Sequence, residues 1–235
     1  MKALSEVFGL FGAQHFQKLY LNNNGITDEM MGILLEGLLE NPHISSLEIV
    51  GNEVKSMGME KLSKFFSQGR KQINVLKLSR TKTDIEQTET LFAALAEYES
   101  LQELTLQNFK ITQEAASSLA AAINNNMFLQ KLDIGWNTMA QPTDFLCLME
   151  QLQDNKHLRE ASFTNIASTK SQGGKDGDLT IADCLTTFIR RNRSLLHLDL
   201  SYMYLGADEV LQIAEACASS RTLLSIHLTG NQVYS

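Results

Sequence analysis

The feature that most constrains the fold is a nine-residue spacing of apolar side chains that recurs along the chain. Its clearest copy runs from Leu129 to Asn137 and reads L-Q-K-L-D-I-G-W-N, with apolar residues at positions one, four and six and asparagine at position nine. The step between successive copies is 28 or 29 residues, apart from one step of 37. Self-similarity at such a period predicts stacked structural repeats. Eight copies begin at Phe16, Ile44, Ile73, Leu101, Leu129, Leu158, Leu195 and Leu223.

Each copy predicts a short β-strand followed by a turn. Side chains alternate between the two faces of a strand, so positions four and six point to the same side. Position nine follows the strand, where a buried asparagine amide can bond the backbone of neighbouring turns. Four copies keep this asparagine, and the other four have Thr81, Phe109, Ile166 and Met203 in its place. We therefore expect an asparagine ladder that is broken in the middle of the array.

A helical segment follows each predicted strand. The stretch 114–123 has apolar side chains on one helical face, and the stretches 28–39 and 207–218 repeat the pattern. No single repeat can bury its apolar side alone, so neighbouring repeats must stack. The sequence thus predicts an α/β solenoid, a curved horseshoe with parallel strands on the concave side and helices on the convex side.

The array defines one elongated domain over residues 16–235. Residues 1–15 are expected to form a short capping segment over the first repeat, because their apolar run lacks a clear signal-cleavage site. The long step places a Gly- and charge-rich insertion near 168–178, which is typical of a loop. The chain ends directly after the eighth predicted strand without a C-terminal cap. That end is expected to be covered by more chain, a partner or a second copy.

Composition narrows the class of partner and the compartment. A net charge of -7 and a pI near 5.3 argue against a nucleic-acid-binding protein, which needs a basic face. No apolar run approaches the length of a membrane-spanning helix, so no membrane insertion is expected. The three cysteines, an odd number without extracellular spacing, favour a reducing setting. We expect an intracellular, cytoplasmic protein.

The motif also predicts which strand residues face outward on the concave side. Strands lie about 4.8 Å apart, so residues at one motif position touch from repeat to repeat. Oppositely charged neighbours there either keep this face soluble or contact a partner. Position three reads Lys18, Ser46, Val75, Glu103, Lys131, Glu160, His197 and Ser225, and position five reads Tyr20, Glu48, Lys77, Thr105, Asp133, Ser162, Asp199 and His227.

Two catalytic interpretations of this face have little support. Ser162, Asp199 and His227 are consecutive in one column, but the base of a triad must lie between the nucleophile and the carboxylate. His197, Asp199 and His227 could hold a metal, although flat strand faces seldom converge three ligands. We expect no enzyme activity, no cofactor and no metal.

Aromatic side chains mark the edge of the same face. Trp136, the single tryptophan, occupies motif position eight, and Tyr202 holds that position two repeats later. Large aromatic residues in such places are favoured as interface anchors, although local packing on the turn is the alternative. The predicted protein-binding residues are Phe109, Lys131, Asp133, Trp136, Asp199, Tyr202, Tyr204 and His227.

The 28- or 29-residue step and copies such as L-Q-K-L-D-I-G-W-N and L-L-H-L-D-L-S-Y-M resemble the ribonuclease-inhibitor-like class of leucine-rich-repeat (LRR) proteins. The resemblance covers residues 16–235. It implies an intracellular eukaryotic protein that holds a protein partner as a non-catalytic scaffold, as a subunit or segment of a larger assembly. The alternatives are a regulator of a small GTPase, similar to Ran-type activators, and an inhibitor of an enzyme. The absent acidic tail weighs against a Ran-type activator, and the few cysteines weigh against the ribonuclease inhibitor itself.

Overall fold

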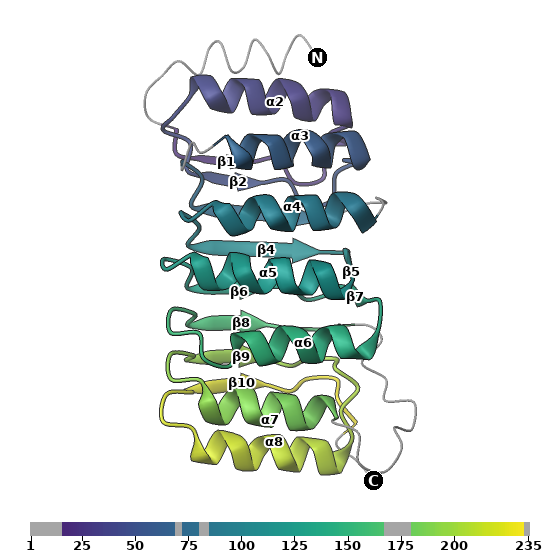
Figure 1. The fold of residues 1–235 in the computed structure, drawn as a ribbon, viewed down its shortest axis with the longest axis vertical. Helices are drawn as coiled ribbons and strands as arrows, with labels where there is room; N and C mark the ends of the chain where they lie inside the picture. Colours follow the sequence, from purple (N-terminus) through teal and green to yellow (C-terminus); the bar gives the residue numbers. More distant parts are fainter. Residues whose placement is uncertain (1–15, 69–71, 80–84, 167–179, 233–235) are drawn as a thin grey trace.

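Short strands and helices alternate along the chain in the computed structural model, which describes residues 16–68, 72–79, 85–166 and 180–232 (Figure 1). The predicted capping segment 1–15 and the predicted insertion 168–178 lie outside these residues. The described elements are β1 (Lys18–Tyr20), α2 (Asp28–Glu40), β2 (Ser46–Glu48), α3 (Ser56–Ser67), β3 (Val75–Ser79), α4 (Ile85–Glu97), β4 (Glu103–Gln107), β5 (Lys110–Ile111), α5 (Gln113–Asn125), β6 (Lys131–Asp133), β7 (Thr138–Met139), α6 (Pro142–Leu152), β8 (Glu160–Ser162), α7 (Ile181–Arg191), β9 (His197–Asp199), α8 (Ala207–Ser219) and β10 (Ser225–His227).

The strands of the described residues form one parallel sheet in the order β1-β2-β3-β4-β6-β8-β9-β10. The short strands β5 and β7 pair separately, just beyond β4 and β6. Helices α2 to α8 form a layer over one face of the sheet, and each helix packs beside the next one (Figure 1). This arrangement is the predicted α/β leucine-rich-repeat solenoid.

The core lies between the sheet and the helix layer, and the repeated apolar positions build it. Motif positions one, four and six are buried in the second repeat, where Ile44 is 4% exposed and Leu47 and Ile49 are 0% exposed. The sixth repeat has a small Ala161 at position four and a large Phe163 at position six. The Phe163 ring lies 5.8 Å from the ring of Phe145, edge to face, so this repeat packs an aromatic pair in the core.

Threonine side chains fix where several helices begin. Thr27, Thr112 and Thr180 each precede a helix and accept a hydrogen bond from a backbone N–H of its first turn. Such a cap contributes about 1 kcal/mol. At α7 the Thr180 backbone N–H also donates a hydrogen bond to the Asp183 carboxylate, and this bond lowers the pKa of Asp183. No helix in the described part of the chain is long and apolar enough to cross a membrane.

The asparagines at position nine clamp each repeat to the one before it. The Asn137 side chain is fully buried, and its Oδ1 accepts a hydrogen bond from the Phe109 N–H at 2.7 Å. Its Nδ2 donates to the carbonyl oxygens of Leu106 and Ile134, both at 2.7 Å. Asn52 and Asn231 repeat this pattern, which we call the asparagine clamp.

The predicted interruption of this ladder is confirmed where the structure describes it. Phe109, Ile166 and Met203 occupy position nine as buried apolar side chains, each at most 2% exposed. They fill the volume of the asparagine and make no amide clamp. Thr81 lies outside the described residues, and Asn24 in the first repeat is exposed. The stacking of repeats four, six and seven therefore rests on apolar packing at this position.

Candidate protein-binding face and rim

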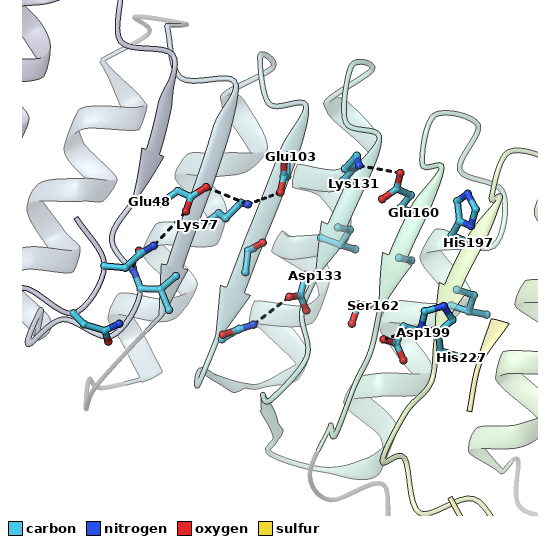
Figure 2. A pocket seen from close by; sticks show the side chains of 18 residues that line it. Glu48, Lys77, Glu103, Lys131, Asp133, Glu160, Ser162, His197, Asp199 and His227 are labelled. Atoms are coloured by element: carbon cyan, nitrogen blue, oxygen red, sulfur yellow. Dashed lines mark hydrogen bonds and ion pairs between the residues drawn. The ribbon is translucent and has the colours of Figure 1, made fainter. Parts of the chain in front are cut away.

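The outward strand residues form the two predicted columns. Lys131 of β6 pairs in register with Glu103 and Glu160, and Asp133 pairs with Thr105 and Ser162. The same register holds across the whole sheet. We call the surface formed by positions three and five the strand face. It is hollowed, with a volume of about 680 Å³ lined by side chains from β2 to β10 (Figure 2).

Ion pairs neutralise most of the charge in the first half of the strand face. The Lys77 ammonium lies 3.1 Å from a Glu48 oxygen and 2.9 Å from a Glu103 oxygen, so it bridges three strands (Figure 2). The hydrogen bond that Lys77 donates to Glu103 raises the pKa of Lys77, and the one that it donates to Glu48 adds to this effect, although burial of the ammonium acts in the opposite direction. Lys131 pairs with Glu160 at 3.0 Å. Partly exposed pairs of this kind contribute at most about 1 kcal/mol each.

Two aspartates of the strand face are tied into the turns that follow their strands. Asp133 Oδ1 accepts a hydrogen bond from the Gly135 N–H at 2.9 Å, and Asp199 Oδ1 accepts one from the Ser201 N–H at the same distance. Aspartate characteristically closes a turn in this way. These two turns present Trp136 and Tyr202, so the carboxylates position the aromatic residues.

Position eight has a positive φ in every repeat whose turn the structure describes. This left-handed conformation costs an ordinary L-residue about 1–2 kcal/mol, whereas glycine and asparagine adopt it readily. Trp136 (φ 59°) and Tyr202 (φ 57°) are the two bulky side chains at this position among the described repeats. The other described repeats place there Asn23 (57°), Gly51 (72°), Asn108 (62°), Asn165 (48°) and Gly230 (74°).

Both aromatic rings nevertheless lie on the surface. Trp136 is 52% exposed and Tyr202 is 46% exposed. Their backbones are fixed, because the Trp136 N–H donates to the Thr164 carbonyl at 2.7 Å and the Tyr202 N–H donates to the Thr229 carbonyl at 2.8 Å. Tyr204, also at positive φ, is 47% exposed. We call Trp136, Tyr202 and Tyr204 the aromatic rim.

One residue of the predicted binding set is misplaced. Phe109 is 2% exposed, and its ring packs at 5.6 Å against the ring of Phe92 in the core. Phe109 occupies position nine, where side chains point inward, so it cannot contact a partner. Lys131, Asp133, Asp199 and His227 line the strand face as predicted (Figure 2).

The left-handed backbone at position eight is the structural feature that the sequence interpretation missed. Its signal was present, since Asn or Gly stands there in most copies of the repeat. Trp136 and Tyr202 depart from that pattern.

The polar side chains at the C-terminal end of the strand face make separate contacts. Ser162 Oγ hydrogen-bonds Thr164 Oγ1 at 3.0 Å, and the closest approach of His227 to Asp199 is 3.8 Å. His197 Nδ1 instead lies 2.6 Å from Ser225 Oγ. Within the described ranges, no three His, Cys, Asp or Glu side chains converge as metal ligands would.

Comparison with known proteins agrees with the repeat register. The family described as Leucine Rich repeat matches residues 12–29. Leucine-rich repeat-containing protein 45 of Gallus gallus is 33% identical over 114 residues, which make up 48% of this chain and 17% of that much longer relative.

Solved structures give the same fold. The chain is similar to the leiomodin-1 actin-binding site 2, with a TM-score of 0.53 and 15% identity over 68% of this chain and 88% of that one. It is also similar to the C-terminal domain of tropomodulin from Caenorhabditis elegans, with a TM-score of 0.52 and 16% identity over 68% and 92% of the two chains. The register of the repeats and these structural similarities show that the chain has the leucine-rich-repeat fold.

Proposed function

We propose that this chain is a non-catalytic scaffold that binds a protein partner through the strand face and the aromatic rim. The observation that carries the proposal is the exposure of Trp136 and Tyr202 at a backbone position where the other described repeats use Asn or Gly. Each aromatic residue bears a conformational cost of about 1–2 kcal/mol. Rings that are half exposed recover only part of that cost by packing within the chain. Contact with a partner supplies the remainder.

The chemistry of the rim suits a protein interface. Tryptophan and tyrosine are enriched among the few residues that carry most of the binding energy at interfaces. The rim is also rigid, since backbone hydrogen bonds to Thr164 and Thr229 hold Trp136 and Tyr202 in place before any partner arrives. Pre-organised anchors lose less conformational entropy on binding.

The strand face adds selectivity more than affinity. Lys77, Lys131 and their carboxylate partners are already paired, and Asp133 is held by Gln107 and Gly135. A partner must match this fixed pattern of charge. Electrostatic matching of this kind governs partner choice and association rate.

The proposal extends to an intracellular, cytoplasmic setting and to the ribonuclease-inhibitor-like class. The three cysteines lie half-buried on α6, α7 and α8 as free thiols. Burial raises the pKa of Cys184 and Cys217, so both stay protonated and behave as packing residues. Their role is therefore compatible with a compartment that forms no disulfides.

The proposal also includes a place in a larger assembly. Leu224, which precedes β10, is 74% exposed, and a partner or a second copy would cover it there. A small-GTPase regulator or an enzyme inhibitor would be a special case of the same scaffold, recognised by the identity of its partner.

The test is affinity capture with quantitative mass spectrometry, using the 235-residue chain. The rim variant is Trp136→Asn/Tyr202→Asn, which installs the residue that other repeats carry. The control is Met57→Ala/Leu211→Ala, which removes two side chains of 61% exposure from α3 and α8. The proposal requires that one partner set is lost with the rim variant and kept with the control. Equal capture by both variants contradicts it.

Purified actin is a defined first candidate partner for this test, because the similar leiomodin-1 region is an actin-binding site.

A further inference from the structure

A second surface, separate from the aromatic rim, is strongly basic in a chain of net charge -7. It lies where α6, α7 and α8 end and the chain returns to β8, β9 and β10. Six exposed cationic side chains gather in these three returns. They are Lys156, Arg159, Arg190, Arg191, Arg193 and Arg221, and we call them the basic edge.

The repeat register aligns three of these cations. Lys156, Arg193 and Arg221 each stand two residues before the first motif position of their repeat. The strands that follow them pair in strict parallel register, so equivalent residues are neighbours. With strands about 4.8 Å apart, this column spans about 10 Å.

The described parts of the earlier returns carry no such charge. The described residues 41–45, 72–74, 98–102 and 126–130 contain no lysine or arginine, and Glu99 is their one carboxylate. Arg70 and Lys71 of the third return lie outside the described residues. Among the described residues, the cations of these returns therefore gather in repeats six to eight.

Helix stability explains only part of the basic edge. Cations in the last turn of a helix interact favourably with its dipole, and Arg190 and Arg191 of α7 lie there. However, α6 and α8 carry no basic residue in their last turns. Lys156, Arg193 and Arg221 lie beyond the helix ends, in the turns themselves.

Intramolecular pairing also leaves most of the basic edge available. Arg191 Nη2 binds both oxygens of Asp154, at 2.9 and 3.2 Å. Arg159 Nη1 donates to the Ser194 carbonyl at 2.9 Å. Asp154 is the single carboxylate in ion-pair contact with the basic edge among the described residues.

We propose that the basic edge binds a short acidic segment of a protein partner. Five of its six cations are arginines, whose planar guanidinium engages a carboxylate through two hydrogen bonds, as Arg191 already does with Asp154. The 10 Å column matches about three residues of extended peptide, at about 3.3 Å per residue. A long polyanion would extend past the column toward Glu99, which also stands two residues before the first motif position of its repeat. A short carboxylate run avoids that repulsion.

Fluorescence anisotropy tests this inference with the 235-residue chain. The probe is a fluorescein-labelled peptide with six consecutive glutamates, and a peptide with six glutamines is its neutral counterpart. The edge variant is Arg193→Gln/Arg221→Gln. The matched control, Lys55→Gln/Lys110→Gln, removes the same charge from two exposed lysines that precede helices.

The expected result is binding of the glutamate peptide alone, weakened about tenfold in the edge variant and changed less than twofold in the control. Added salt should weaken the binding of the glutamate peptide further. Equal affinity for both variants overturns the inference. The inference is also overturned if the chain binds single-stranded DNA, or vesicles rich in phosphatidylserine, more tightly than it binds the glutamate peptide. The Trp136→Asn/Tyr202→Asn variant should bind the peptide normally, which separates this inference from the proposed scaffold.

Discussion

The ring of Tyr202 lies directly against the backbone of Gly230 in the following repeat. A Cβ atom on Gly230 would overlap Cδ1 and Cε1 of that ring. Gly230 also has a φ of 74°. Asn23 and Gly51 form the same pair at the start of the array, where the asparagine side chain covers the glycine. In these two pairs of repeats, the position-eight side chain of one repeat thus rests on position eight of the next.

The substitution Gly230→Ala should therefore destabilise the protein for two reasons, the left-handed backbone and the overlap with Tyr202. Gly25→Ala is the matched control, because Gly25 has a φ of 63° but no atom within 4 Å of an added Cβ. We expect Gly25→Ala to cost about 1 kcal/mol and Gly230→Ala at least about 2 kcal/mol. Urea unfolding measures both, and equal losses would show that the ring moves aside freely.

The asparagine clamp gives a second prediction. Asn137→Ala removes three buried hydrogen bonds, one from the Phe109 N–H and two to the carbonyl oxygens of Leu106 and Ile134. Since each unsatisfied buried group costs about 1–3 kcal/mol, we expect a loss of about 3 kcal/mol. Asn24→Ala, at the exposed first copy, should change the free energy of unfolding by less than about 0.5 kcal/mol. Similar losses in both variants would contradict the role of the clamp.

Tyr98 predicts a pH dependence of stability. The Ile73 N–H donates to its hydroxyl at 2.6 Å, and burial raises the pKa of Tyr98 to about 12. The unfolded chain ionises this tyrosine near pH 10, so above that pH it binds fewer protons than the folded chain. Stability therefore falls as the pH rises from 10 to 12, and the loss at pH 11 is roughly 1 kcal/mol.

The variant Tyr98→Phe isolates this contribution. It should be less stable than the wild type at pH 8, because the Ile73 N–H loses its acceptor. The difference between the two proteins should narrow by roughly 1 kcal/mol between pH 9 and pH 11. Urea unfolding at each pH gives both values. A difference that stays constant with pH would mean that Tyr98 does not titrate in this range.

The repeat spacing was sufficient to predict the sheet, its register and the two outward columns. Register follows from sequence here because positions four and six must both face the core, and a slip of one residue would turn Leu47 outward. The same logic predicted the broken ladder at Ile166 and Met203. These features depend on local spacing alone.

Other features depend on three-dimensional contacts and could not be predicted in this way. Phe109 is predicted at the edge of the binding face because it lies near the aromatic residues of that edge in the repeat pattern, yet position nine points inward even when it holds an aromatic residue. The position-five column places Lys77 beside Glu48, and the structure adds an ion pair with Glu103 of the other column, because the long lysine side chain reaches across both columns. The conformation and the ion-pair partners of a long side chain depend on its neighbours on adjacent strands.

The aromatic rim predicts a conflict between stability and binding. Replacing Trp136 and Tyr202 by asparagine relieves two left-handed bulky residues, so we expect the free energy of unfolding to stay constant or rise by up to about 1 kcal/mol. Partner capture should be lost in the same variant. Thermal unfolding measures the first effect, and a marked destabilisation would mean that the rings serve local packing.

The most direct test of the scaffold uses the fact that Trp136 is the single tryptophan of the chain. Incorporation of 5-fluorotryptophan gives one ¹⁹F resonance, which reports on this side chain alone. Addition of an unlabelled partner from the capture experiment should shift or broaden that resonance, because the ring leaves water on binding. A partner that binds the chain at saturation and leaves the resonance unchanged would contradict the aromatic rim as the binding site.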